Sequence, residues 1–178
     1  IIGASGSGKT TMLNIIGGLD TDYMGSCVVR NKEISSLSDV ECCTLRSRYI
    51  SYVYQFFNLI SFLTVKENVC LASQIKGKKV DEKELNQVLK LLGLEHKKDC
   101  FANELSGGQQ QRVAIARAIL AHTDIILADE PTGNLDGENA KNVMDILKAL
   151  NKEGKTIVLV THDLKVANYA DRIIRLEQ

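Results

Sequence analysis

The sequence predicts an α/β fold with a mainly parallel sheet and one inserted helical region. Short apolar runs of strand length alternate with amphipathic helical patterns in residues 1–62 and 119–178, whereas the stretch 63–118 carries helical patterns. Pro131 is the only proline among the 178 residues, and no low-complexity linker interrupts the chain. We therefore expect one domain, with a nucleotide-binding-type core at 1–62 and 119–178 and a helical subdomain at 63–118.

The segment before the insertion should supply the first part of the sheet. Residues 1–2 are expected to end a strand, and an amphipathic pattern predicts a helix over 10–17. Runs of β-branched and aromatic residues then predict strands at 26–34 and 48–55.

The insertion and the segment after it continue the pattern. An apolar stripe predicts a helix over 81–92, with Asp81 as its cap and Gly93 at its end. The same reasoning predicts a helix at 109–121, a strand at 124–129, a helix at 139–152, a strand at 156–161, a short helix at 164–170 and a last strand at 172–176.

Composition and charge exclude several classes of protein. Lys plus Arg and Asp plus Glu both number 22, so the formal net charge is zero, and we expect no nucleic-acid partner. No apolar run reaches the roughly 18 residues of a membrane span, and no signal peptide is recognisable. The chain begins at Ile1 without a Met, which suggests a piece of a longer protein. Its five cysteines are odd in number and form no C-x-x-C pair, which favours reduced cytosolic thiols over a zinc or redox site.

A glycine-rich loop follows the first strand remnant and fits G-x-x-x-x-G-K-[ST] at every position. Small residues let backbone N–H groups approach phosphate oxygens, and the next helix directs its positive end at them. Lys9 is expected to reach the β- and γ-phosphates and the Thr10 hydroxyl to bind Mg²⁺. The motif is typical of P-loop NTPases, which include kinases, GTPases and transport ATPases. The phosphate-binding residues are expected to be Gly3, Ala4, Ser5, Gly6, Ser7, Gly8, Lys9 and Thr10.

Two carboxylates and a histidine follow apolar strands. Asp129 ends the strand at 124–129 and is expected to hold Mg²⁺ through water, while Glu130 could polarise a water for attack on the γ-phosphate. His162 follows the strand at 156–161 and should emerge at the same sheet edge, since functional groups collect at the carboxyl ends of parallel strands. There it could hydrogen-bond the γ-phosphate or orient the Glu130–water pair.

The most specific stretch is Leu-Ser-Gly-Gly-Gln at 105–109. Ser106 with Gln109 fits a capping box, but a cap alone needs neither Gly107 nor Gly108. Exposed N–H groups at a helix N-terminus suit an anion, so this stretch predicts a second phosphate-contacting loop.

Together these motifs resemble the ATPase subunit of an ATP-binding-cassette (ABC) transporter. The similarity includes the phosphate loop, Gln55, the stretches 105–109 and 127–130, Asn134-Leu135-Asp136 and His162, and it extends over essentially the whole chain. The stretches 14–20, 63–69 and 129–136 resemble the lipoprotein-release and macrolide-export branch.

The resemblance implies a mechanism. Two subunits pair head to tail around two ATP molecules, each held by the loop Gly3–Thr11 of one subunit and by the 106–109 stretch of the other. Glu130 would be the general base, with His162 and Lys9 contacting phosphate. Gln55 would contact Mg²⁺ and the attacking water. The trans contacts would come from Ser106, Gly107, Gly108 and Gln109, with Asp136 at the dimer seam.

The resemblance also implies partners and a location. An integral-membrane permease would hold the ATPase at the cytoplasmic face of the cell membrane. The family's adenine-stacking aromatic lies upstream of the phosphate loop and so outside this sequence. Ser61 and Lys32 depart from the branch pattern at positions peripheral to the chemistry. Two alternatives stay open: a regulatory ABC ATPase coupled to cell-wall remodelling, and a small P-loop kinase, which would leave the 105–109 stretch unexplained.

Overall fold

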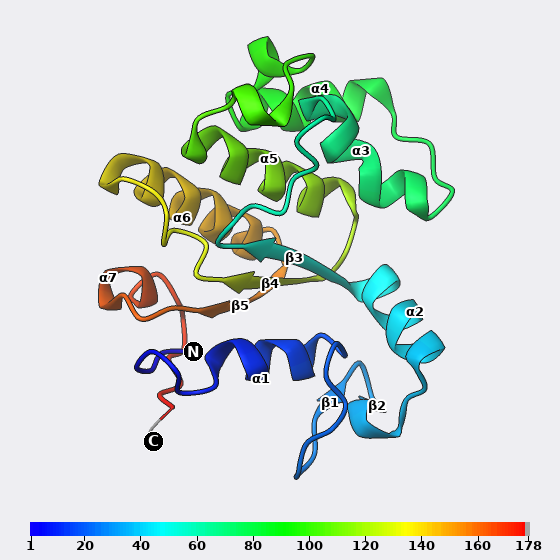
Figure 1. The fold of residues 1–178 in the computed structure, drawn as a ribbon, viewed down its shortest axis with the longest axis vertical. Helices are drawn as coiled ribbons and strands as arrows, with labels where there is room; N and C mark the ends of the chain where they lie inside the picture. The colour runs from blue at the N-terminus through cyan, green and yellow to red at the C-terminus, as the bar shows by residue number, and fades with distance from the viewer. Residues whose placement is uncertain (177–178) are drawn as a thin grey trace.

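The computed structural model describes residues 1–176 and confirms an α/β fold (Figure 1). Its main sheet has three parallel strands in the order β3-β4-β5, with Ile126 paired to Ser51 on one side and to Ile157 on the other. The strands are β3 (Ile50–Tyr54), β4 (Ile125–Asp129) and β5 (Thr156–Val160). The helices are α1 (Lys9–Ile16), α2 (Asp39–Tyr49), α3 (Val65–Ile75), α4 (Glu82–Leu91), α5 (Gly107–Leu120), α6 (Gly137–Lys152) and α7 (Leu164–Ala167).

The chain start extends this sheet beyond β5. Ile2 forms isolated parallel bridges with Thr161 on one side and with Arg175 on the other. The predicted last strand at 172–176 is therefore reduced to one bridge at Arg175, supported by the hydrogen bonds of the Ile2 backbone to Ile174 and Leu176. These bonds place the start of the phosphate loop between two neighbouring segments of the sheet.

The predicted strand at 26–34 is wrong, because a turn divides it. The segment forms an antiparallel hairpin of β1 (Val28–Val29) and β2 (Lys32–Glu33). Arg30 and Asn31 make the turn with φ of 51° and 60°, a left-handed conformation that usually attracts glycine. Because neither residue is a glycine, the usual sequence signal for such a turn is absent.

The helix α2 occupies a stretch for which the periodicity predicted no element. Its surface has little apolar contrast, since Cys42 and Leu45 are its buried residues. A capping box of Ser38 and Glu41 starts it, and β3 begins directly after it at Ile50 rather than at 48.

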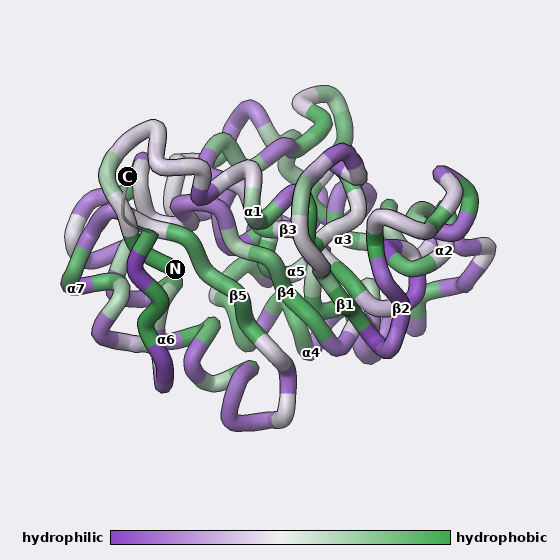
Figure 2. The backbone as a smooth tube through the Cα atoms, turned by 90° about the horizontal axis from the view of Figure 1, so that it is seen from below, coloured by the Kyte–Doolittle hydropathy of each residue, from purple (hydrophilic) through white to green (hydrophobic). Residues whose placement is uncertain are grey.

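Both faces of the sheet are covered by helices, with α1 on one side and α5 and α6 on the other (Figure 1). Ile126 and Ala128 of β4 belong to the larger core cluster with α3–α6, and Leu127 between them packs with Leu13 of α1 on the opposite face. The strands β4 and β5 are accordingly apolar along most of their length (Figure 2), as expected for a parallel sheet buried on both faces. Within residues 1–176, no helix combines the length and apolar character that a bilayer crossing requires.

Candidate nucleotide site

The phosphate loop is folded around its lysine. Gly6 and Gly8 have φ of 81° and 85°, which side chains with a Cβ rarely adopt. This turn brings Lys9 Nζ within 2.9 Å of the Gly3 carbonyl and 2.6 Å of the Ala4 carbonyl, and only 8% of Lys9 is exposed. The N-cap Gly8 offers no side chain to the first turn of α1, so the N–H groups there stay available to an anion.

The loop and His162 face the same cavity. This cavity of about 350 Å³ is lined by Gly3, Ala4, His162, Leu164 and residues of the 175–176 segment. The loop and the residues after β5 therefore meet at the carboxyl edge of the sheet, as the motif positions predict.

Thr10 and Asp129 form the pair expected to hold a cation. The Thr10 hydroxyl donates to Asp129 Oδ1 at 3.2 Å across the gap between α1 and β4. Burial raises the pKa of Asp129, and the hydrogen bond from Thr10 acts in the opposite direction. A hydroxyl and a carboxylate are hard oxygen donors of the kind Mg²⁺ prefers, and the two lie on adjacent elements, so these residues fit that ion.

Glu130 is the most constrained carboxylate of the site. Its backbone has a φ of 44°, which turns the side chain off the line of β4. Oε2 accepts from Thr161 Oγ1 at 2.9 Å, and Oε1 accepts from the His162 backbone N–H at 3.0 Å and lies 2.7 Å from His162 Nδ1. The Glu130 side chain is 14% exposed, whereas the His162 ring is 67% exposed. The Glu130 carboxylate is thus largely buried and hydrogen-bonded to the residues after β5, while the His162 ring faces solvent.

Gln55 pairs with the turn after β4. Asn134 Nδ2 donates to the Gln55 carbonyl at 3.0 Å, and Gln55 Nε2 donates to Asn134 Oδ1 at 3.4 Å. The side chain predicted to contact Mg²⁺ therefore bonds Asn134 here, rather than Thr10 or Asp129.

The turn that follows Gln55 is hydrogen-bonded to Arg117 of α5. Phe57 and Asn58 have φ of 62° and 47°, and both of their carbonyls accept from the Arg117 guanidinium, at 3.1 and 2.7 Å. Burial lowers the pKa of Arg117. This contact ties the Gln55 loop to the helix that carries the 105–109 stretch.

Ser106 caps α5 as the sequence predicted. Its backbone N–H donates to Gln109 Oε1 at 3.0 Å, and the Gln109 N–H donates to Ser106 Oγ at 3.4 Å. Gly107 and Gly108 form the first turn. An added Cβ on Gly108 would lie 2.4 Å from Asn139 Oδ1, so the Asn139 amide would have to move to admit a larger residue.

Asp136 caps α6 and is joined to α5 through Asn139. Its carboxylate accepts from the Asn139 backbone N–H at 2.9 Å and from Asn139 Nδ2, and the backbone bond holds the pKa of Asp136 below its usual value. Arg112 Nη1 donates to Asn139 Oδ1 at 3.2 Å. The start of α5 and the start of α6 therefore form one polar junction.

The predicted residues fall into two groups in space. The phosphate loop, Asp129, Glu130 and His162 share one edge of the sheet. Within residues 1–176, no hydrogen bond joins the 105–109 stretch to the phosphate loop. Sequence reasoning missed Thr161, Asn139 and Arg117, whose roles depend on contacts between distant elements.

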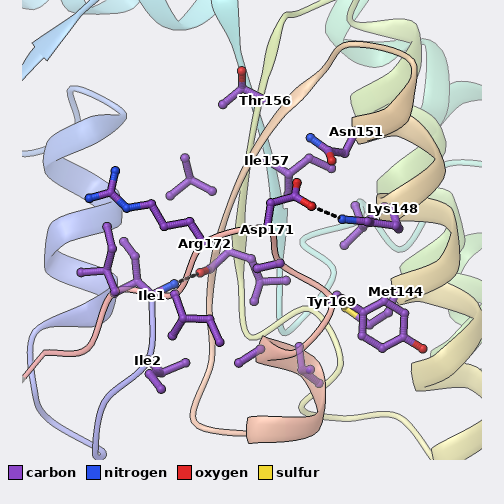
Figure 3. Close-up of a pocket in the computed structure, with 18 of the residues that line it drawn as sticks. Ile1, Ile2, Met144, Lys148, Asn151, Thr156, Ile157, Tyr169, Asp171 and Arg172 are labelled. Carbon is purple, nitrogen blue, oxygen red and sulfur yellow. Dashed lines mark hydrogen bonds and ion pairs between the residues drawn. The ribbon is translucent and has the colours of Figure 1, made fainter.

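A larger cavity lies away from this chemistry. Its volume is about 470 Å³, and apolar residues of β5, α6 and the segment 169–174 line most of it (Figure 3). Lys148 and Asp171 form an ion pair of 2.6 Å at its wall, and the Ile1 amino group donates to the Leu159 carbonyl. It contains none of the residues predicted to bind nucleotide.

Comparison with known proteins identifies relatives over the whole chain. A family model described as "ABC transporter" matches residues 1–133. The macrolide export ATP-binding/permease protein MacB of Campylobacter jejuni is 50% identical over 99% of this chain and 28% of its own length. The lipoprotein-releasing system ATP-binding protein LolD of Colwellia psychrerythraea is 41% identical over 100% of this chain and 70% of its own length.

Solved structures agree with the sequence relatives. A dimeric bacterial ABC transporter cassette superimposes with a TM-score of 0.88 at 47% identity, covering 98% of this chain and 78% of the other. A post-hydrolysis cassette dimer bound to ADP and phosphate gives a TM-score of 0.88 at 45% identity, covering 99% and 79%. The chain spans about 28% of the MacB relatives it matches. With the phosphate loop, the paired carboxylates and these matches in place, the chain belongs to the ABC transporter family as an ATPase domain.

Proposed function

We propose that this chain binds ATP with Mg²⁺ at the carboxyl edge of its sheet and hydrolyses it to drive a membrane permease of the export or lipoprotein-release type. The observation that carries this proposal is the convergence of a lysine-centred phosphate loop, the Thr10–Asp129 pair and the Glu130–His162 pair on one edge. The names of the relatives, macrolide export and lipoprotein release, support the transport type.

The nucleotide would be held by the loop residues 3–11, with Lys9 on the terminal phosphates. Thr10 and Asp129 would hold Mg²⁺, directly and through water, and the ion would neutralise charge that develops on the phosphates. The side-chain amide of Gln55 would also contact the ion and the attacking water.

Glu130 would act as the general base. Its carboxylate would accept a proton from the attacking water, and the hydrogen bonds from Thr161 and the His162 backbone support this role by fixing its position. When Glu130 is ionised it can only accept, so the short contact requires the proton on His162 Nδ1.

Glu130→Gln in the full-length protein tests this role. The amide keeps the shape of the carboxylate but cannot take a proton, so we expect steady-state hydrolysis to fall by at least about a hundredfold while ATP binding is retained. The exposed Glu95→Gln is the matched control and should hydrolyse ATP normally. Normal turnover of Glu130→Gln would remove Glu130 as the base.

The complete site would need a second copy of the chain. Ser106, Gly107, Gly108 and Gln109 lie outside the phosphate-loop group and would reach the nucleotide of a head-to-tail partner, with Asp136 at the seam. Dimeric solved cassettes support this arrangement. Mixing Ser106→Arg subunits with Lys9→Ala subunits should restore one working site per dimer. A mixed dimer that forms without regaining activity would contradict the trans contact.

The same proposal includes the domain organisation, the location and the partners of the chain. Residues 63–118 would form the helical subdomain, and 1–62 with 119–178 the nucleotide-binding core. The permease would hold the domain at the cytoplasmic face of the cell membrane. The zero net charge is consistent with a membrane protein and a second copy as partners, and with no nucleic acid.

A further inference from the structure

The Glu130 carboxylate has a buried partner that the family motifs do not assign. Thr161 follows β5, is 0% exposed and places its hydroxyl 2.9 Å from Glu130 Oε2. The same hydroxyl oxygen accepts from the Asp163 backbone N–H at 3.1 Å. A hydroxyl has one proton, and an ionised carboxylate can only accept, so the direction of both bonds is fixed: Thr161 accepts from Asp163 and donates to Glu130.

We propose that Thr161 is a positioning residue that aims Glu130 for proton abstraction. The proposal rests on the proposed role of Glu130 as the base. Oε1 is held by two groups of His162, its backbone N–H and Nδ1, while among the described residues Thr161 is the hydrogen-bond donor to Oε2. The terminal torsion of a glutamate is broad and soft, so a carboxylate held at one oxygen can still rotate. The second contact, at Oε2, removes that freedom.

Thr161 is itself rigid, which a positioning role requires. Its backbone N–H donates to the Ile1 carbonyl at 3.1 Å, and it forms a parallel bridge with Ile2 at the start of the phosphate loop. Its β-branched side chain has restricted χ1 freedom. The Thr161 hydroxyl therefore fixes the position of Glu130 relative to the backbone segment that leads into the phosphate loop.

Isosteric substitution separates positioning from mere stability. Thr161→Val keeps the shape and removes the hydroxyl, whereas Thr161→Ser keeps the hydroxyl. Thr123 gives a matched control: it is 1% exposed, and its hydroxyl lies 2.6 Å from Ser51 Oγ, in a pair at the other end of β3 and β4. Thr123→Val removes a comparable buried hydroxyl away from Glu130.

ATP hydrolysis by the full-length protein is the measurement, with thermal unfolding in parallel. We expect Thr161→Val to lower kcat about tenfold with KM for ATP within about twofold, and Thr161→Ser to stay within about threefold of the wild type. Thr123→Val should lower the unfolding temperature without a loss of kcat. If Thr161→Val does not fold, Thr161→Ala carries the same expectation for kcat.

Combination with Glu130→Gln separates the possible failures. If Glu130→Gln lowers the rate as expected, adding Thr161→Val to it should not lower the remaining rate further, because the carboxylate that Thr161 positions is already absent. An unchanged kcat in Thr161→Val, or an equal loss in Thr161→Ser, overturns the positioning role and leaves the proposed function intact. Normal turnover by Glu130→Gln would overturn both.

Discussion

Gln55, which follows β3, and Asn134, in the turn after β4, form two hydrogen bonds. Asn134 Nδ2 donates to the Gln55 backbone carbonyl at 3.0 Å, and Gln55 Nε2 donates to Asn134 Oδ1 at 3.4 Å. The contact joins two loops that are 79 residues apart in the chain. Asn134 therefore stabilises one orientation of the Gln55 loop and of the Gln55 side-chain amide.

Asn134→Ala should loosen the Gln55 loop. Because one strong and one long hydrogen bond are lost at an exposed position, the free energy of unfolding should fall by no more than about 1 kcal/mol. We expect kcat to change by about two- to fivefold, as the released Gln55 samples more orientations. The exposed Asn142→Ala of α6 is the control, and ATPase kinetics with chemical denaturation provide the measurement. Equal kinetics for both variants would contradict the link.

Gly108→Ala should strain the junction of α5 and α6. The new methyl would lie 2.4 Å from Asn139 Oδ1, which Arg112 holds in place, so a loss of about 1–3 kcal/mol in unfolding free energy is expected. Gly137→Ala in α6 is the matched control, because its methyl would meet nothing within 4 Å. Urea denaturation measures both. Adding Asn139→Ala should recover part of the Gly108→Ala loss, and strict additivity of the two would argue against the clash.

Lys9→Ala should weaken ATP binding. A charge-assisted contact to phosphate is worth about 1.5–3 kcal/mol, which corresponds to roughly a ten- to hundredfold rise in Kd. Calorimetric titration with a non-hydrolysable ATP analogue measures this, with the exposed Lys141→Ala as the control. Unchanged affinity in Lys9→Ala would contradict the phosphate-loop assignment.

Glu33 should make the hairpin sensitive to acid. Hydrogen bonds from the Ser26 hydroxyl and the Cys27 backbone N–H lower the pKa of Glu33 from 4.5 to about 2. Because the folded pKa is the lower one, the carboxylate stabilises the fold above about pH 4.5, and that contribution is lost as the pH falls toward 2. Glu33→Gln should therefore lower the unfolding temperature at about pH 7, and less so at about pH 3. A pH-independent difference, or an equal effect of Glu95→Gln, would contradict this.

The elements that the sequence predicted correctly are those whose signal is local. The strands β4 and β5 are continuous apolar runs, and α6 has a regular stripe, so their burial is visible in the residues themselves. The helix α2 was missed because it buries little, although the spacing of Ser38 and Glu41 marked its start. The hairpin turn was missed because Arg30 and Asn31 adopt positive φ without a glycine.

The candidate site divides in the same way. Residues within contiguous motifs, such as Lys9 and Glu130, could be predicted from their neighbours in the chain. The contacts of Thr161 and Asn139 could not, because they depend on which strands pair and on how α5 meets α6. Gly108 is intermediate: the sequence shows a glycine that a helix cap does not need, but the side chain it would clash with, 31 residues later, is visible only in the fold.

The hydrogen bonds of Arg117 to the Phe57–Asn58 turn link this turn to the position of α5. Arg117 lies ten residues beyond Gly107 on α5, about 15 Å along the axis of a stiff helix. A tilt of about 10° about the Gly107 end would swing the Arg117 end by about 2.5 Å, enough to break its hydrogen bonds unless the turn moves too. The two hydrogen bonds of Arg117 therefore make the conformation of the turn after Gln55 depend on the orientation of α5.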